Sequence, residues 1–215
     1  MRKHLASMIP NDPVGVGNAA VDPYAGYLVY DTFTDDDNTV LASHTPDKAP
    51  VGSVWVECGD VADAPKIISN KLQAAASFKE ERAYINCGDA DVTVEVDATR
   101  HNPNADNNQH GIVFRATDFN NHWIYRYLNT VGQAWLDEWD GGVETNKGKI
   151  AFSWADEATY TIKSILAADA IEGYIGATQT HTITDATHQT IENHGVHTYY
   201  HQGDYSTLDD FRVTA

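Results

Sequence analysis

The feature that most constrains the fold of this chain is the strict alternation in "DVTVEVDA", Asp91 to Ala98. Val92, Val94 and Val96 fall on one side, and acidic residues and threonine fall on the other. Successive side chains of a β-strand point to opposite faces, so this pattern is typical of a strand that is buried on one face only. The segment therefore predicts a sheet with a core-facing side and a polar side.

Further short segments rich in β-branched and aromatic residues follow one another, with turn residues between most of them. They are "YLVYDTF", "HGIVFRA", "HWIYRYL", "QAWLDEW", "YTIKSILA", "AIEGYIGA", "THTITD", "GVHTYYH" and "LDDFRV". The only helix-like stretch is "DATHQTIEN", residues 185–193, one or two turns at most. Many short strands at a spacing of about 8–12 residues predict an all-β, antiparallel sandwich or barrel.

The first segment of the chain, residues 1–26, has no periodic apolar pattern and is interrupted by Pro10, Pro13 and Pro23. We expect an extended N-terminal arm there, followed by a single β-domain over residues 27–215. An arm without a core of its own needs something to hold it. It lies either against its own domain or against a neighbouring subunit, and the sequence leaves both alternatives open.

The formal net charge of the 215-residue chain is −17 at pH 7. Contacts with nucleic-acid phosphates require Lys and Arg, so we expect no nucleic-acid partner, and an anionic membrane surface is disfavoured for the same reason. No apolar run approaches the roughly 20 residues of a membrane helix. The first residues also lack the apolar stretch of about 7–15 residues found in signal peptides. We therefore expect no export by the usual route, unless a signal has been removed.

Three segments together resemble one family. "YDTFTDDDNTVLASHTPD" followed by "VWVECGD" is similar to the opening of concanavalin A-like, laminin-G-like jelly rolls that are common in phage structural proteins. "GIVFRATDFNNHWIYRYL", residues 111–128, resembles the central hairpin of that family, and "LDDFRV", residues 208–213, resembles its closing strand. The resemblance covers residues 27–215. It implies a jelly-roll-like β-sandwich, and for function it implies glycan binding, virion decoration or an inert module.

In a jelly roll the first and last strands usually lie side by side. That arrangement brings Asp31 and Phe33 near Asp210 and Phe211. We expect the two phenylalanines to point into the core and the two aspartates to lie near a sheet edge.

The acidic segment "WLDEWDGGVE" raises the question of catalysis. Glucanases of the resembled superfamily carry Glu-x-Asp-x-Glu on one strand, whereas Glu138, Asp140 and Glu144 are spaced two residues further apart. Asp140-Gly141-Gly142 is a hairpin-turn signal, which places Glu144 on the returning strand. We therefore expect an acidic hairpin and no enzyme activity.

Two candidate cation sites use oxygen ligands of the kind that Ca²⁺ prefers. In "TDDDNT", Asp35 and Asp37 are the candidate ligands, and a second option pairs Asp31 with Asp210. Aspartates in a row are also ordinary turn formers, so both sites have a purely structural alternative.

The histidines near the C-terminus, His194, His197 and His201, do not predict a metal site. His197 and His201 share a face of a straight strand but lie about 13 Å apart, too far for one metal ion. The two cysteines, Cys58 and Cys87, could form a disulfide that closes a loop of about 30 residues. Two cysteines do not establish a disulfide framework, so we expect free, partly buried thiols.

The best binding candidates are aromatic. Trp123 and Tyr125 alternate on one strand, and Trp135 and Trp139 lie on the next. Sugars stack on exposed aromatic faces beside polar side chains, so these four residues are the predicted ligand-binding set. The alternative is that the same residues fill the core, as at least half of the aromatic residues in this region should.

These observations favour a non-enzymatic virion structural protein, such as a capsid decoration, fibre or tail component. Its lectin-like domain would face outward and bind host-surface or environmental glycans. The arm would contact other virion proteins, and we expect a homo-oligomer. The alternatives are a glycan-binding module of a secreted, extracellular protein and, third, a glycoside hydrolase.

Overall fold

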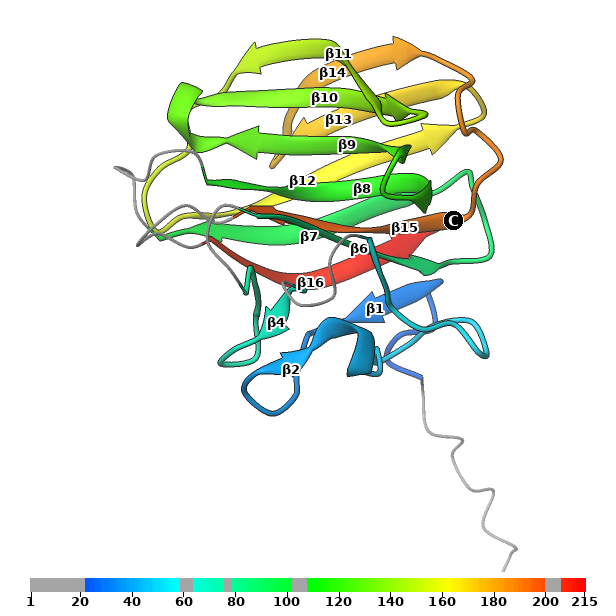
Figure 1. The fold of residues 1–215 in the computed structure, drawn as a ribbon, viewed down its shortest axis with the longest axis vertical. Helices are drawn as coiled ribbons and strands as arrows, with labels where there is room; N and C mark the ends of the chain where they lie inside the picture. The colour runs from blue at the N-terminus through cyan, green and yellow to red at the C-terminus, as the bar shows by residue number, and fades with distance from the viewer. Residues whose placement is uncertain (1–21, 59–63, 76–78, 102–107, 200–205) are drawn as a thin grey trace, which may run out of the picture.

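The computed structural model describes residues 22–58, 64–75, 79–101, 108–199 and 206–215. These residues form sixteen β-strands in two antiparallel sheets, which are the two layers of a sandwich (Figure 1). Within the same ranges the helical turns are two short 3₁₀ helices, Leu41–Ser43 and Asn129–Val131. None of the helical turns that are described has the length and apolar character needed to cross a membrane. The predicted all-β, jelly-roll-like sandwich is confirmed.

The first layer is a nine-stranded sheet. Its strands, in spatial order, are β14 (Thr178–Thr184), β13 (Ala170–Ile175), β12 (Thr159–Ala167), β7 (Thr93–Arg100), β16 (Ser206–Thr214), β5 (Leu72–Gln73), β4 (Lys66–Ile67) and β2 (Thr39–Val40), with β1 (Val29–Asp31) also paired to β16. The longest strands lie at the centre, and the short strands β1, β2, β4 and β5 lie at one end (Figure 1).

The second layer is a seven-stranded sheet. Its strands, in spatial order, are β11 (Val143–Ala151), β10 (Gln133–Asp140), β9 (Asn121–Leu128), β8 (Gln109–Asp118), β15 (Asn193–Tyr199), β6 (Glu80–Asn86) and β3 (Val56–Cys58). Strands β8 to β11 are consecutive hairpins. They face the consecutive hairpins of β12 to β14 across the sandwich (Figure 1).

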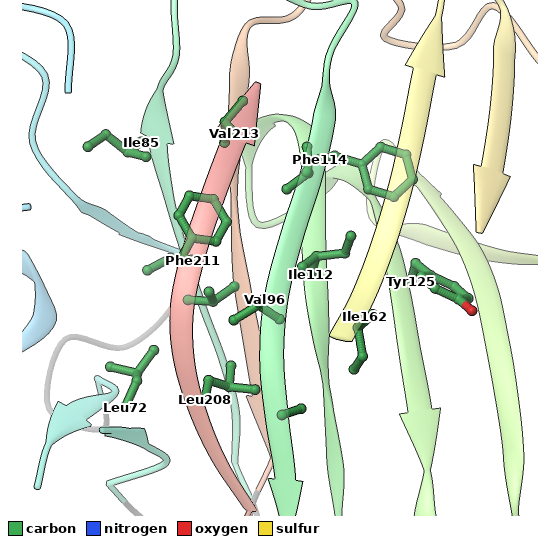
Figure 2. Close-up of a cluster of buried hydrophobic side chains, with 14 of the residues drawn as sticks. Leu72, Ile85, Val96, Ile112, Phe114, Tyr125, Ile162, Leu208, Phe211 and Val213 are labelled. Carbon is green, nitrogen blue, oxygen red and sulfur yellow. The ribbon is translucent and has the colours of Figure 1, made fainter. Parts of the chain in front are cut away.

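The core lies between the two sheets. Val92, Val94 and Val96 point into it, as their alternation predicts, and are at most 2% exposed. Figure 2 shows side chains of both sheets meeting there, among them Phe114 of β8 and Phe211 of β16. Burying a large apolar side chain contributes about 1.5–3 kcal/mol, so this cluster supplies the main driving force for bringing the sheets together.

The two ends of the domain pair as the resemblance implies. β1 and β16 are antiparallel, with Asp31 opposite Phe211, and the side chains of Phe33 and Phe211 are fully buried. Asp31 lies on β1, a strand at the periphery of the nine-stranded sheet, and its side chain is nevertheless fully buried. The reason is a set of buried hydrogen-bond donors around its carboxylate, described below.

Residues 185–192 form a loop with a turn at 187–190, and residue 193 begins β15, so the short helix that the sequence suggested is not present there. The Asp185 carboxylate accepts a hydrogen bond from the Thr187 amide, and the Trp123 indole donates to the Thr187 carbonyl. Side-chain partners of this kind take the place of the backbone bonds that a helix would make. The two cysteines, Cys58 and Cys87, are free and buried, as expected. Most of the predicted arm, residues 1–21, lies outside the described residues.

Candidate functional site

The seven-stranded sheet has a second face, which points away from the core and is called the outer face below. Its side chains form rows, because residues that pair across antiparallel strands project on the same side. The central row contains, strand by strand from β3 to β11, Cys58, Arg82, His197, Gly111, Arg126, Trp135 and Lys149. Basic, imidazole and indole groups from strands far apart in sequence are thereby placed side by side.

Two glycines lie near the centre of the outer face. A Cβ atom at Gly111 would come within 2.2 Å of the Tyr125 carbonyl oxygen, and one at Gly195 within 1.9 Å of the Ala83 carbonyl oxygen. No side chain fits at such distances, so the neighbouring backbones can approach this closely only because both residues are glycine. In the middle of the outer face the surface is therefore formed by backbone atoms, and larger side chains surround it.

Arg126 organises one half of the outer face. Its Nε donates to Asp137 Oδ2 at 3.1 Å, its Nη2 to Glu144 Oε1 at 2.6 Å, and its Nη1 to Glu80 Oε1 at 3.1 Å and to the Gln109 amide oxygen at 2.9 Å. The side chain is only 4% exposed, so these bonds hold several strands in a fixed arrangement. Buried charge pairs of this kind are stable only when each member finds its partners.

Asp137 is the most deeply buried acid of this network. Burial raises the pKa of its carboxyl above the ordinary value, and the charge of Arg126 opposes that shift. The Asn146 side-chain amide also donates to Asp137 Oδ1 at 2.5 Å. Both carboxylate oxygens are therefore occupied, and the group serves to hold Arg126 in place.

Trp135 lies beside this network and is partly exposed. The Lys149 ammonium is 3.6 Å from the centroid of its ring, and the Arg126 guanidinium carbon is 5.8 Å from that centroid. Its indole N–H donates to the Gln133 side-chain oxygen at 3.0 Å. The ring is thus fixed in orientation and lies next to several hydrogen-bonding groups.

The other half of the outer face is built on Arg82. Its guanidinium forms an ion pair with Glu80 and lies 4.6 Å from the ring centroid of Phe119 and 4.9 Å from that of Trp139. The imidazole of His122 stacks on Trp139, with ring centroids 5.7 Å apart. Cation–π contacts and stacking hold these side chains together away from bulk water.

The histidines of this half are neutral. Burial, reinforced by the nearby charge of Arg82, lowers the pKa of His122 to about 3. Burial also lowers the pKa of His197 well below its ordinary value, and the charges of Arg82 and Arg126 add to this effect. A neutral imidazole has one donor and one acceptor nitrogen, and therefore suits hydroxyl groups and other neutral partners.

Several nitrogens in this half make no hydrogen bond within the described part of the chain. They are Nε and Nη1 of Arg82, both ring nitrogens of His122 and of His197, and Nε1 of Trp139. Buried polar atoms are nearly always hydrogen-bonded in proteins, and leaving one unpaired costs about 1–3 kcal/mol. A group of unpaired nitrogens beside aromatic rings therefore marks this part of the outer face as a candidate ligand site. The name Arg82 cluster is used below for Arg82, Phe119, His122, Trp139 and His197.

The predicted aromatic set divides between the two faces. Trp135 and Trp139 lie on the outer face, but Trp123 and Tyr125 are fully buried in the core. The Tyr125 hydroxyl bonds to the Thr180 hydroxyl of β14, on the opposite sheet, at 2.6 Å. The prediction that Trp123 and Tyr125 bind ligand is therefore wrong, because their rings fill the space between the sheets.

The acidic hairpin is confirmed. Gly141 and Gly142 connect β10 to β11 with positive φ angles of 59° and 81°, and Trp139 pairs with Glu144. Glu144 therefore lies on the outer face with Arg126, whereas Glu138 points the other way and pairs with Lys147 at 2.7 Å. The two glutamates do not face a common site.

The candidate cation ligands have other partners. Asp31 accepts bonds from the His44 imidazole at 2.9 Å and from the Trp55 indole at 2.7 Å, and Asp35 binds the other nitrogen of His44 at 2.9 Å. Asp37 Oδ1 accepts from the Ser69 amide at 2.7 Å. His44, which the sequence did not single out, thus bridges Asp31 and Asp35.

The second candidate cation site pairs Asp31 with Asp210. The Asp210 carboxylate accepts a hydrogen bond from the Tyr30 hydroxyl at 2.7 Å, away from the carboxylate of Asp31. Within the described ranges no three His, Cys, Asp or Glu side chains converge as metal ligands. Among the described residues, no cluster of metal ligands therefore supports a cation between Asp31 and Asp210.

The C-terminal histidines lie apart, as expected. His194 belongs to the inner side, and its Nε2 donates to the Asp89 carbonyl oxygen at 3.0 Å, whereas His197 is on the outer face. His201 lies outside the described residues. Sequence reasoning missed Arg82, His122 and Arg126. A signal for two of them was present, since His122 and Arg126 alternate with the aromatic residues of "HWIYRYL" and so had to share the opposite face.

Comparison with known proteins places the fold. No family model matches the sequence, and no curated protein matches it. Among solved structures, a carbohydrate-binding module, CBM66 from Bacillus subtilis, superposes with a TM-score of 0.61 at 12% identity, covering 75% of this chain and 95% of that one. A β-glucanase from Bacillus licheniformis gives a TM-score of 0.58 at 13% identity, covering 86% and 97% of the two chains.

A third structure, a protein of unknown function with a galectin-like fold from Bacillus subtilis, gives a TM-score of 0.55 at 13% identity, covering 74% of this chain and 88% of that one. The fold class follows from these superpositions and from the two antiparallel sheets. The chain is an all-β jelly-roll sandwich of the concanavalin A-like type. At such identities the likeness shows the fold alone, and function has to be argued from the outer face.

Proposed function

We propose that this protein is a non-catalytic glycan-binding module whose ligand binds on the outer face of the seven-stranded sheet. The observation that carries the proposal is the Arg82 cluster, where buried nitrogens without hydrogen-bond partners lie beside the aromatic rings of Phe119 and Trp139. Sugars need this combination, because their hydroxyl groups require hydrogen bonds and their C–H faces stack on aromatic rings. The similarity of the fold to a carbohydrate-binding module supports the same conclusion.

The Arg126 network supports the proposal from the other half of the face. It presents a partly exposed Trp135 ring whose orientation is fixed by Lys149 and Gln133. A ring that is already ordered loses little conformational entropy on binding. Trp135 and Trp139 are four residues apart on the same face of β10, a separation of about 13 Å, so one extended oligosaccharide could contact both halves.

The proposal includes the absence of catalysis. A retaining glycoside hydrolase needs two carboxyl groups about 5–5.5 Å apart, one of which gives up a proton to the leaving group. On the outer face Asp137 and Glu144 are both held by Arg126, and Glu138 lies on the opposite side of the hairpin. We expect no release of reducing ends from β-glucans or other polysaccharides, measured over hours at high protein concentration.

A glycan array followed by calorimetric titration tests the binding. We expect micromolar affinity for at least one oligosaccharide and a loss of at least tenfold in Trp135→Ala. The matched control is Tyr174→Ala, because Tyr174 carries a lysine over its ring in the same way, Lys163 at 4.6 Å, but lies on the nine-stranded sheet. An unchanged affinity in Trp135→Ala, or equal losses in both variants, would contradict the assignment of the outer face.

We further propose that the module is carried on a virion, with the arm of residues 1–26 as its attachment and an oligomer as its working form. The family resemblance of residues 27–215 motivates this part of the proposal. Light scattering and electron microscopy of the full chain test it. A monomer at all concentrations would contradict the oligomer, and a secreted glycan-binding protein is the alternative that it would favour.

A further inference from the structure

The unpaired nitrogens of the outer face share one chemical property. Nε and Nη1 of Arg82 and Nε1 of Trp139 can only donate hydrogen bonds, and each neutral imidazole of His122 and His197 donates once and accepts once. Among the described residues of this face, no buried oxygen is left without a partner beside them. Donors are therefore in excess, and the ligand group that satisfies them must be rich in acceptors.

Among the described residues, the carboxylate that pairs with Arg82 is that of Glu80, and Arg82 shares it. Glu80 binds Arg82 through one oxygen and Arg126 through the other, at 3.1 Å. Of the other acids near the cluster, Asp137 and Glu144 are held by Arg126, and Asp118, beside His122, accepts hydrogen bonds from Asn120 and Asn121. Arg82 is thus a guanidinium that is 1% exposed and, within the described part of the chain, shares a single paired carboxylate with Arg126. A buried charge in this state is stabilised strongly by a second anion, since charge-assisted hydrogen bonds are about twice as strong as neutral ones.

We propose that the Arg82 cluster binds the carboxylate of an acidic sugar, so that the ligand of the outer face is a glycan containing uronic acid. The carboxylate accepts from Arg82 and from the N–H of His197, which is paired with Arg82 in register. The sugar ring lies against Trp139, whose indole N–H donates to a ring or hydroxyl oxygen. This inference rests on the proposed function and specifies its ligand.

The aromatic residues over Arg82 suggest how the ligand enters. Phe119 lies in the turn between β8 and β9 and is partly exposed, whereas Trp139 is fixed by stacking on His122. Movement of Phe119 alone uncovers one side of the guanidinium. Removal of that ring should therefore favour binding of the acidic sugar.

The test uses oligosaccharides of glucuronic, galacturonic and mannuronic acid, each compared with its carboxyl-reduced, neutral form by calorimetry on the full chain. We expect at least one acidic oligosaccharide to bind tenfold or more tightly than its reduced form. Its affinity should fall as NaCl is raised from 50 to 500 mM. Arg82→Gln should remove the preference, and Phe119→Ala should increase the affinity two- to fivefold.

The charge-matched control is Arg212→Gln, because Arg212 pairs with Asp97 and Glu95 on the nine-stranded sheet, away from the outer face. It should keep the preference. Should Arg82→Gln fail to fold, His197→Leu and Trp139→Phe each remove a donor and should each lower acidic-sugar affinity. Equal or tighter binding of the neutral forms overturns the acidic-sugar inference but leaves the glycan-binding module intact. Failure of every oligosaccharide to bind overturns both.

Discussion

Acidification should destabilise this protein strongly, because several of its histidines are buried in the neutral form. Burial lowers the pKa of His110 to about 3, of His122 to about 3 and of His194 to about 4. In the unfolded chain the same groups titrate near 6.5. Since the folded-state pKa values are the lower ones, the unfolded chain binds more protons, and the stability falls as the pH drops below 6.5.

The magnitude follows from these shifts. Between pH 6.5 and pH 5 each neutral buried histidine costs about 2 kcal/mol, because one pH unit corresponds to about 1.4 kcal/mol. For the three groups together this is about 6 kcal/mol, comparable to the whole stability of an ordinary domain, about 5–15 kcal/mol. His197 adds to the loss. Carboxyl groups in model peptides titrate at about pH 4, so the interval from 7.5 to 5 reports mainly on histidine.

Urea unfolding followed by tryptophan fluorescence at pH 7.5, 6.5, 5.5 and 5.0 measures the effect. We expect the free energy of unfolding to fall by several kcal/mol between pH 6.5 and pH 5, and to fall by a smaller amount above pH 7, where His44 loses its proton. In His110→Gln the fall should be smaller by about 2 kcal/mol, whatever the variant's stability at pH 7.5. A free energy of unfolding that does not change between pH 7.5 and pH 5 would refute the reasoning, as would an identical slope in His110→Gln.

Three further predictions concern other parts of the molecule. Burial alone would lower the pKa of His44, but its hydrogen bonds to Asp31 and Asp35 raise it to about 8. The stability from this group is therefore present below pH 6.5 and lost as the pH rises through 8, and urea unfolding of His44→Gln should lack that alkaline loss. Gly195→Ala should abolish folding, seen as loss of the β-sheet circular dichroism signal, because its Cβ would lie 1.9 Å from a carbonyl oxygen; Gly26→Ala, with nothing within 4 Å, should fold normally. Burial raises the pKa of Cys58 and of Cys87 to about 12, so neither thiol should react with a disulfide reagent at pH 8 until urea unfolds the chain, and rapid native-state labelling would contradict their burial.

The hairpin at Gly141-Gly142 shows what local sequence can predict. Two consecutive glycines after an aspartate favour a tight turn, and a turn fixes which residues return on the next strand. The separation of Glu138 from Glu144 followed from that rule alone and is confirmed. The pairing of the first and last strands came from the family resemblance, and no local pattern contained it.

The candidate site shows where local sequence fails. β9 carries large side chains on both faces, Trp123 and Tyr125 on one and His122 and Arg126 on the other. Alternation predicts that the two sets separate but does not say which one faces the partner sheet. Aromatic rings suggested binding, yet in this strand they fill the core, and the polar set forms the outer face.

The sequence by itself determined that this chain is a β-sandwich, where its hairpins turn and which residues share a face of each strand, because these properties depend on neighbours a few residues apart. Only the tertiary structure decided which face is buried, and that Arg82 of β6, His197 of β15 and Arg126 of β9 lie in one row. The pairing of β6 with β15 joins residues more than a hundred positions apart along the chain, and such long-range pairing depends on the packing of the whole sandwich.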